Sequence, residues 1–176
     1  MDEIIVAGFG GQGILVLGQL IAYAGMIENK AVSWFPSYGP EQRGGTCNCS
    51  VVVSDTDIGS PIVSEPTIAI IMNRPSLDRF EPMIKPGGLL LYNTTLIHET
   101  PKRSDIHIIG VPANEIGEEL GNTRVSNMVL LGALVEATQI VSIARIEASL
   151  ANVLSQRHHH LIRLNMQALA RARVSQ

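Results

Sequence analysis

Short apolar runs alternate along this chain with segments whose apolar residues recur every three or four positions. The runs predict strands at 3–7, 31–35, 47–54, 67–72, 89–92 and 106–111. The periodic segments predict helices after residue 13 and at 75–81, 112–120, 127–140, 142–154 and 158–172. Because strands alternate with helices, we expect an α/β fold. It would be an open, mainly parallel, Rossmann-like sheet with helices on both faces, in a single domain over residues 1–176.

Breaker residues refine these boundaries. Gly25 is expected to stop the first helix, and Pro36 is expected to end the second strand. The third strand is rich in β-branched residues and is followed by a turn at 55–57. It predicts an antiparallel excursion at one edge of the sheet.

The first of two glycine-rich segments directly follows the first predicted strand. It reads Gly8, Phe9, Gly10, Gly11, Gln12, Gly13, and it matches G-x-G-x-x-G before a helix. Such a loop allows close backbone approach, and the helix N-terminus favours an anion. A dinucleotide site also needs an acid at the end of the second strand, but Glu28 precedes that strand. A nucleotide site, a tight turn without ligand and a site shared with a partner chain all stay open.

The second glycine-rich segment follows the second predicted strand. Its candidate contact residues are Ser37, Tyr38, Gly39, Glu41, Arg43 and Gly44. Arg43 either binds a phosphate or carboxylate or pairs with Glu41. If the first two strands run in the same direction, both glycine-rich segments lie at the carboxyl edge of the sheet, where α/β proteins bind ligands.

Composition narrows the class of partner. Only 16% of the residues are charged, so we expect a partner to cover part of the surface. The net charge is -3 and no basic stripe occurs, which argues against nucleic acid. The longest apolar stretches are too short to span a membrane, and a strand begins almost at the N-terminus. We therefore expect a cytoplasmic protein.

No residue set in the sequence predicts a metal site. Cys47 and Cys49 are two thiols on one predicted strand face, whereas iron–sulfur and structural zinc sites need about four ligands. The three residues of the run His158–His160 are adjacent to one another on a predicted helix, so their side chains would point in different directions. We expect a solvated helix face there.

The two glycine-rich segments together resemble the gamma subunit of 2-oxoacid:ferredoxin oxidoreductases. The resemblance extends over most of the chain. Further matching stretches are V-V-V-S-D at 51–55, I-G-S-P-I-V at 58–63, N-R-P-S-L-D at 73–78, K-P-G-G at 85–88, N-E-I-G-E-E-L-G-N at 114–122 and N-M-V-L-L-G-A-L at 127–134. The pattern is most similar to subunits that act on 2-oxoglutarate or a branched-chain 2-oxoacid, with pyruvate left open.

The resemblance implies a subunit of an enzyme that oxidatively decarboxylates a 2-oxoacid and forms an acyl-CoA. Thiamine diphosphate and iron–sulfur clusters would belong to alpha and beta subunits, with a delta subunit as an open option, and electrons would pass to ferredoxin. The isolated chain would be inactive, with no catalytic residue of its own and no firmly bound cofactor. Both glycine-rich segments would line a subunit interface or the coenzyme A entry, with Gln12 and Arg43 as polar contacts. A stand-alone nucleotide-binding reductase and a purely scaffolding subunit remain alternatives.

Overall fold

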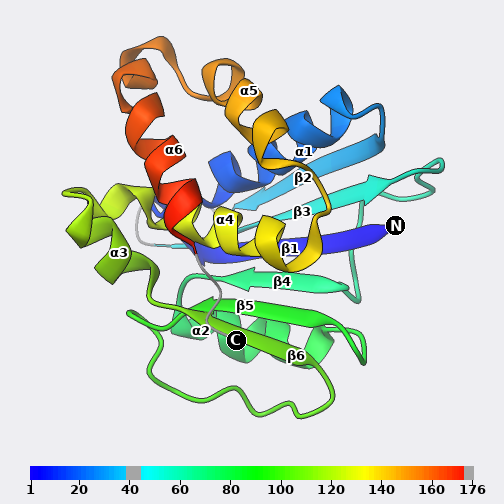
Figure 1. The fold of residues 1–176 in the computed structure, drawn as a ribbon. Coiled ribbons are helices and arrows are strands. Elements are labelled where there is room, and N and C mark those ends of the chain that lie inside the picture. The colour runs from blue at the N-terminus through cyan, green and yellow to red at the C-terminus, as the bar shows by residue number, and fades with distance from the viewer. Residues whose placement is uncertain (39–44, 173–176) are drawn as a thin grey trace.

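The computed structural model describes residues 1–38 and 45–172 (Figure 1). These residues form a six-stranded sheet in the order β2-β3-β1-β4-β5-β6. The strands are β1 (Asp2–Phe9), β2 (Ala31–Tyr38), β3 (Thr46–Ser54), β4 (Ile68–Ile71), β5 (Leu89–Asn93) and β6 (His107–Val111). The α-helices are α1 (Ile14–Ile27), α2 (Arg74–Phe80), α3 (Ala113–Glu119), α4 (Ser126–Thr138), α5 (Ile143–Val153) and α6 (Ile162–Arg171).

Strands β1, β4, β5 and β6 are parallel, and the antiparallel pair β2–β3 extends the sheet beyond β1. Because β3 is antiparallel to both of its neighbours, β1 and β2 run in the same direction. Cys47 of β3 is level with Gly8 on one side and with Tyr38 on the other. The predicted mainly parallel sheet with an antiparallel edge excursion is confirmed, and β1 and β2 end at the same edge.

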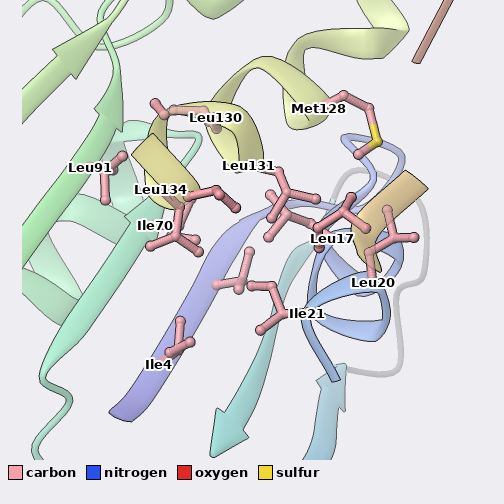
Figure 2. Packing of buried hydrophobic residues seen from close by; sticks show 14 of the residues in the cluster. Ile4, Leu17, Leu20, Ile21, Ile70, Leu91, Met128, Leu130, Leu131 and Leu134 are labelled. Atoms are coloured by element: carbon pink, nitrogen blue, oxygen red, sulfur yellow. The ribbon is translucent and has the colours of Figure 1, made fainter. Parts of the chain in front are cut away.

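Helices cover both faces of the sheet, as predicted. On one face α1 and α4 pack against the strands, while α5 packs on α1 and α6 on α4 (Figure 1). The core on this side joins Ile4 and Ile70 of the sheet to Leu17 of α1 and Leu131 of α4 (Figure 2). Helix α4 is buried through most of its length because it lies between the sheet and α6. This explains why its sequence is apolar on all sides.

The opposite face carries α2, which packs Leu77 and Phe80 against the sheet. Helix α2 begins at Asn73, whose Oδ1 accepts a hydrogen bond from the Ser76 amide at 2.9 Å, and Pro75 lies in its first turn. The helix predicted at 75–81 is thus confirmed, shifted by one residue at each end.

Two of the predicted boundaries are wrong. Strand β2 continues through Pro36 to Tyr38, and Pro36 is level with Cys49 of β3. Proline is tolerated because β2 is an edge strand, with no further strand on its outer side among the residues that the structure describes. Helix α1 likewise continues through Gly25 to Ile27. A Cβ atom on Gly25 would lie 2.7 Å from Cγ1 of Val32, so this glycine lets the helix approach the sheet.

The predicted helix 158–172 is also wrong in its first part. A 3-10 helix spans Gln156–Leu161, and α6 begins only at Ile162. Nδ1 of His158 lies 3.0 Å from Oγ of Ser155, and Nε2 of His159 lies 3.0 Å from the Leu154 carbonyl oxygen. These local contacts hold the histidines in a tighter turn. Among the described residues there is no group of three potential metal ligands, and no helix long and apolar enough to cross a membrane.

The two cysteines are free thiols on the α1 face of β3, as predicted. Cys49 is fully buried below Gly18 of α1, and Cys47 is nearly so. Burial raises the pKa of the Cys49 thiol to about 12, with the nearby Cys47 adding to the rise and the Trp34 indole N–H opposing it. Burial also raises the pKa of Cys47.

We expect the protein to lose stability in alkaline solution through Cys49. The unfolded chain releases this proton above about pH 8.5, whereas the folded chain keeps it up to about pH 12. The stabilising contribution is therefore complete below pH 8.5 and is lost as the pH rises toward 12. Urea unfolding at pH 8 and pH 10 should differ by about 1–2 kcal/mol more in the wild type than in Cys49→Ala. Equal pH dependence of the two proteins would contradict the assignment.

Candidate site at the carboxyl edge of the sheet

The two glycine-rich segments meet where β1 ends and β3 begins. The Gly10 amide donates a hydrogen bond to the carbonyl oxygen of Gly45 at 3.0 Å. Gly45 is the last residue of the second segment, and Ser37 and Tyr38 end the neighbouring strand β2. The segments are therefore joined at the carboxyl edge, at the left of the sheet in Figure 1.

The side chain of Gln12 folds back over the end of β1. Its Oε1 accepts a hydrogen bond from the Phe9 amide at 2.6 Å, and its Nε2 donates to the Met72 carbonyl oxygen at 3.2 Å. Met72 follows β4, so Gln12 links the carboxyl ends of two adjacent parallel strands. This is also the point where the chain reverses its direction across the sheet, the usual ligand crevice of α/β folds.

The glycines around Gln12 are required for different reasons. A Cβ atom on Gly8 would lie 2.5 Å from Oε1 of Gln12, so a side chain at this position would displace the glutamine. Gly11 and Gly13 have φ of 98° and 76°, in the left-handed region that favours glycine. A Cβ atom on Gly13 would also lie 2.3 Å from Nδ2 of Asn127, a buried residue of α4.

A hollow of about 160 Å³ lies beside this loop. Its lining residues come from the loop, from the start of α3 and from the turn before α4: Gly11, Gln12, Asn114, Thr123, Arg124 and Ser126. The hollow has room for one small group, not for a whole coenzyme. It thus brings the loop at the end of β1 together with residues that lie about 100 positions later in the sequence.

The electrostatics of the hollow favour an anion. Helix α1 starts at Gly13 without a side-chain cap and without an acidic residue in its first turn, so its partial positive charge is not offset locally. Arg124 adds a full positive charge, and no carboxylate is among the lining residues. A phosphate or carboxylate group is the chemistry that fits these donors.

Further polar groups lie at the same edge. Asn93 ends β5 and is fully buried; its Nδ2 donates to Oδ1 of Asn114 at 2.8 Å, and its Oδ1 accepts from the Ala113 amide at 3.2 Å. These bonds fix Asn114 at the hollow. Asn73, after β4, is 3% exposed, and its Nδ2 has no partner in the part of the chain that the structure describes. It is an unused donor at the end of β4.

The structure brings part of the predicted site together. The end of β1 and the loop after it contain Gly8, Gly10, Gly11, Gln12 and Gly13. Ser37 is the second-last residue of β2 and is level with Asn48. The backbone of Tyr38 ends that strand. Gly39, Glu41, Arg43 and Gly44 lie outside the described residues.

Sequence reasoning did not find several residues of this edge as site residues: Asn73, Asn93, Asn114, Thr123, Arg124 and Asn127. Some lie in stretches that already supported the resemblance, 73–78, 114–122 and 127–134. No local spacing indicates that these stretches fold next to residues 8–13.

The model of the pyruvate ferredoxin/flavodoxin oxidoreductase family matches residues 3–174. The chain belongs to this family. The predicted resemblance to gamma subunits of 2-oxoacid:ferredoxin oxidoreductases is confirmed by the relatives. The chain is 36% identical to the 2-oxoglutarate synthase subunit KorC of Methanothermobacter marburgensis, over 85% of this chain and 84% of that protein.

A longer relative is the ketoisovalerate oxidoreductase subunit VorA of the same organism. It is 45% identical over 73% of this chain, and the match spans only 27% of that protein, about a quarter of its length.

Solved structures agree with the fold. The keto/oxoacid ferredoxin oxidoreductase gamma subunit of Geobacter sulfurreducens superposes with a TM-score of 0.81 at 27% identity, over 98% of both chains. The 2-oxoglutarate:ferredoxin oxidoreductase of Magnetococcus marinus, solved with 2-oxoglutarate, coenzyme A and succinyl-CoA bound, superposes with a TM-score of 0.86 over 98% of this chain and 30% of that one. At 23% identity, the second comparison shows the fold alone.

Proposed function

We propose that this chain is a gamma-type subunit, folded as a single domain, of a 2-oxoacid:ferredoxin oxidoreductase. The observation that carries the proposal is the family match over residues 3–174 together with the joining of both glycine-rich segments at one edge of the sheet. The substrate would be 2-oxoglutarate or a branched-chain 2-oxoacid, because relatives named for both occur among the similar proteins. Pyruvate stays open, and the product would be an acyl-CoA.

Other subunits would hold the thiamine diphosphate and the iron–sulfur clusters and would pass electrons to ferredoxin. This chain has two cysteines, both buried as free thiols, whereas a cluster needs about four thiolates. The alpha and beta subunits, with a delta subunit in a four-subunit form, are therefore the expected partners. The role of this chain would be to complete a subunit interface near the active site or the coenzyme A entry.

The loop geometry supports this role over a stand-alone nucleotide-binding reductase. In dinucleotide-binding folds the second strand lies beside the first, and its end holds the ribose. Here β3 separates β2 from β1, and Glu28 accepts hydrogen bonds from the amide and Oγ of Ser142, both at 2.8 Å. The hollow at Gly11 and Arg124 fits one anionic end of a ligand, such as a phosphate of coenzyme A.

Reconstitution tests the proposal. The isolated chain should show no turnover with 2-oxoglutarate, 2-oxoisovalerate or pyruvate, whereas adding thiamine-binding and iron–sulfur subunits should give ferredoxin reduction that depends on coenzyme A. Calorimetry of the isolated chain with NAD, NADP, FAD and coenzyme A tests the alternative, a stand-alone nucleotide-binding reductase. Tight binding of NAD or FAD, without any gain of activity on adding subunits, would favour the reductase.

We expect Arg43→Ala in the assembled enzyme to raise the KM for coenzyme A or lower kcat by about tenfold or more, since a charged contact contributes about 1.5–3 kcal/mol. The measurement is steady-state ferredoxin reduction at varied coenzyme A. Arg79→Ala is the matched control, because Arg79 lies on α2, which packs on the face of the sheet opposite to α1. Unchanged kcat and KM for Arg43→Ala would favour the scaffolding alternative.

A further inference from the structure

Charged residues are unevenly distributed along this chain. Of its 13 basic and 16 acidic residues, only Glu28, Lys30, Glu41 and Arg43 lie between residues 4 and 54. This stretch contains α1, β2 and β3, which together hold no charged residue. The charge-poor part of the sequence is thus also one end of the sheet in space (Figure 1).

Helix α1 exposes apolar side chains at helical spacing. Tyr23, Met26 and Ile27 are 40%, 57% and 36% exposed, at positions i, i+3 and i+4 of the helix. A helix that is apolar on every side is normally buried on every side. The inner side of α1 is covered by the sheet and by α5, but this outer stripe is not covered by any described part of the chain.

Strand β2, the edge strand next to α1, is also uncharged and exposes an apolar side chain. Strand β2 has eight residues, none of them charged, and Phe35 is 50% exposed on the face of the sheet away from α1. Proteins protect free edge strands with charges, bulges or short length, and here only Pro36 interrupts the hydrogen-bonding edge. Val32 and Trp34 of β2 face Gly25 and Gly18 of α1, so the exposed stripe of α1 and the free edge of β2 lie next to each other at this end of the sheet.

We infer that the outer stripe of α1 and the edge of β2 form a docking surface for a neighbouring subunit of the same oxidoreductase. Depletion of charge with exposed Met and aromatic residues is typical of the core of an interface. A helix of 14 residues is about 21 Å long and a strand of eight about 26 Å, so the surface extends over roughly 20–25 Å and forms part of one side of a standard interface. The occupant presents an uncharged, apolar surface, because any charge buried here would lack a partner.

This inference rests on the proposed function, which supplies the neighbouring subunit. The identity of the occupant is supported by the relatives: proteins similar to this chain are named as subunits, and in VorA the matched region is part of a much longer chain. In such a chain the corresponding region is covalently continuous with further protein of the same subunit. A second copy of this chain would be the competing occupant.

The test is Met26→Glu in the tagged chain, co-expressed with the thiamine-binding and iron–sulfur subunits of the enzyme. We expect the affinity for those subunits to fall at least about thirtyfold, because the carboxylate would be buried without a partner. Met166→Glu is the matched control: Met166 is also an exposed methionine, 37% exposed, but lies on α6. It should assemble like the wild type, and both variants should keep the wild-type thermal unfolding midpoint.

The possible outcomes test the docking surface and the proposed function separately. Assembly of Met26→Glu with wild-type affinity overturns the docking surface while leaving the proposed function intact. Failure of the wild-type chain to bind any of those subunits overturns both. A dimer of the isolated chain that Met26→Glu dissociates shows that the occupant is a second copy and overturns the assignment of this surface to a different subunit. If Met26→Glu does not fold, Tyr23→Lys tests the same stripe from its other end.

Discussion

Gly13→Ala is expected to lower the free energy of unfolding by about 2–4 kcal/mol, because the new methyl group meets a backbone penalty and a packing penalty. Gly13 has φ of 76°, and its Cβ would lie 2.3 Å from Nδ2 and 2.9 Å from Cγ of Asn127. Asn127 cannot easily move aside, since it is buried and its Nδ2 donates to the Gly13 carbonyl oxygen at 3.2 Å. Urea unfolding followed by circular dichroism measures the change.

Gly11→Ala is the matched control, because it separates the two penalties. Gly11 has φ of 98°, but no atom lies within 4 Å of the position of its Cβ, so only the backbone penalty of about 1–2 kcal/mol is expected. Adding Asn127→Ala to Gly13→Ala should recover part of the packing penalty, which a double-mutant cycle detects. If Gly13→Ala costs no more than Gly11→Ala, Asn127 does not constrain the loop.

Much of the fold could be predicted from the sequence because its signals are local. Apolar periodicity located the strands and helices. In α1, the apolar residues Ile14, Leu17, Ile21 and Ala24 recur every three or four positions, and all four are buried. The turn after β3 and its β-branched composition predicted the antiparallel excursion. Because β3 is antiparallel to both of its neighbours, β1 and β2 run in the same direction, and the two glycine-rich segments therefore meet at one edge.

The wrong boundaries share one physical cause: the tertiary environment overrides a local preference. Pro36 continues a strand because β2 is the edge strand of the described sheet. Gly25 does not end the helix: it is there because Val32 leaves no room for a side chain. The final helix starts late because Ser155 and the Leu154 carbonyl contact the histidine rings. None of these contacts is visible in the spacing of residues along the chain.

Only the part of the candidate site that lies in residues 8–13 could be predicted from the sequence. The loop at residues 8–13 has a recognisable pattern, but its partners come from α4, from the end of β4 and from the start of α3. Gly13 and Asn127 are 114 positions apart, and Gln12 and Met72 are 60 apart. A single sequence contains no signal for such pairings, so the residues that constrain the loop became visible only in the structure.

The second large effect is expected for Gln12→Leu. The substitution keeps the size of the side chain but removes both hydrogen bonds that link the ends of β1 and β4. Because Met72 is fully buried, its carbonyl oxygen would lose a partner that water does not replace, a cost of about 1–3 kcal/mol. In the assembled enzyme we expect kcat/KM to fall about 100-fold, since a displacement of about 1 Å in a positioning loop has effects of that size.

Gln12→Glu tests whether the hydrogen bond to the Met72 carbonyl oxygen, rather than the one from the Phe9 amide, holds the loop in position. A glutamate still accepts from the Phe9 amide but cannot donate to the Met72 carbonyl when ionised, so it keeps one bond and loses the other. If the link between the strands positions the loop, both variants lose activity, and amide hydrogen exchange at residues 9–13 accelerates in the isolated chain. If Gln12→Leu retains wild-type kcat/KM and wild-type exchange, Gln12 does not position the loop. A ligand contact through Gln12 would instead lower activity in both variants while leaving the exchange unchanged.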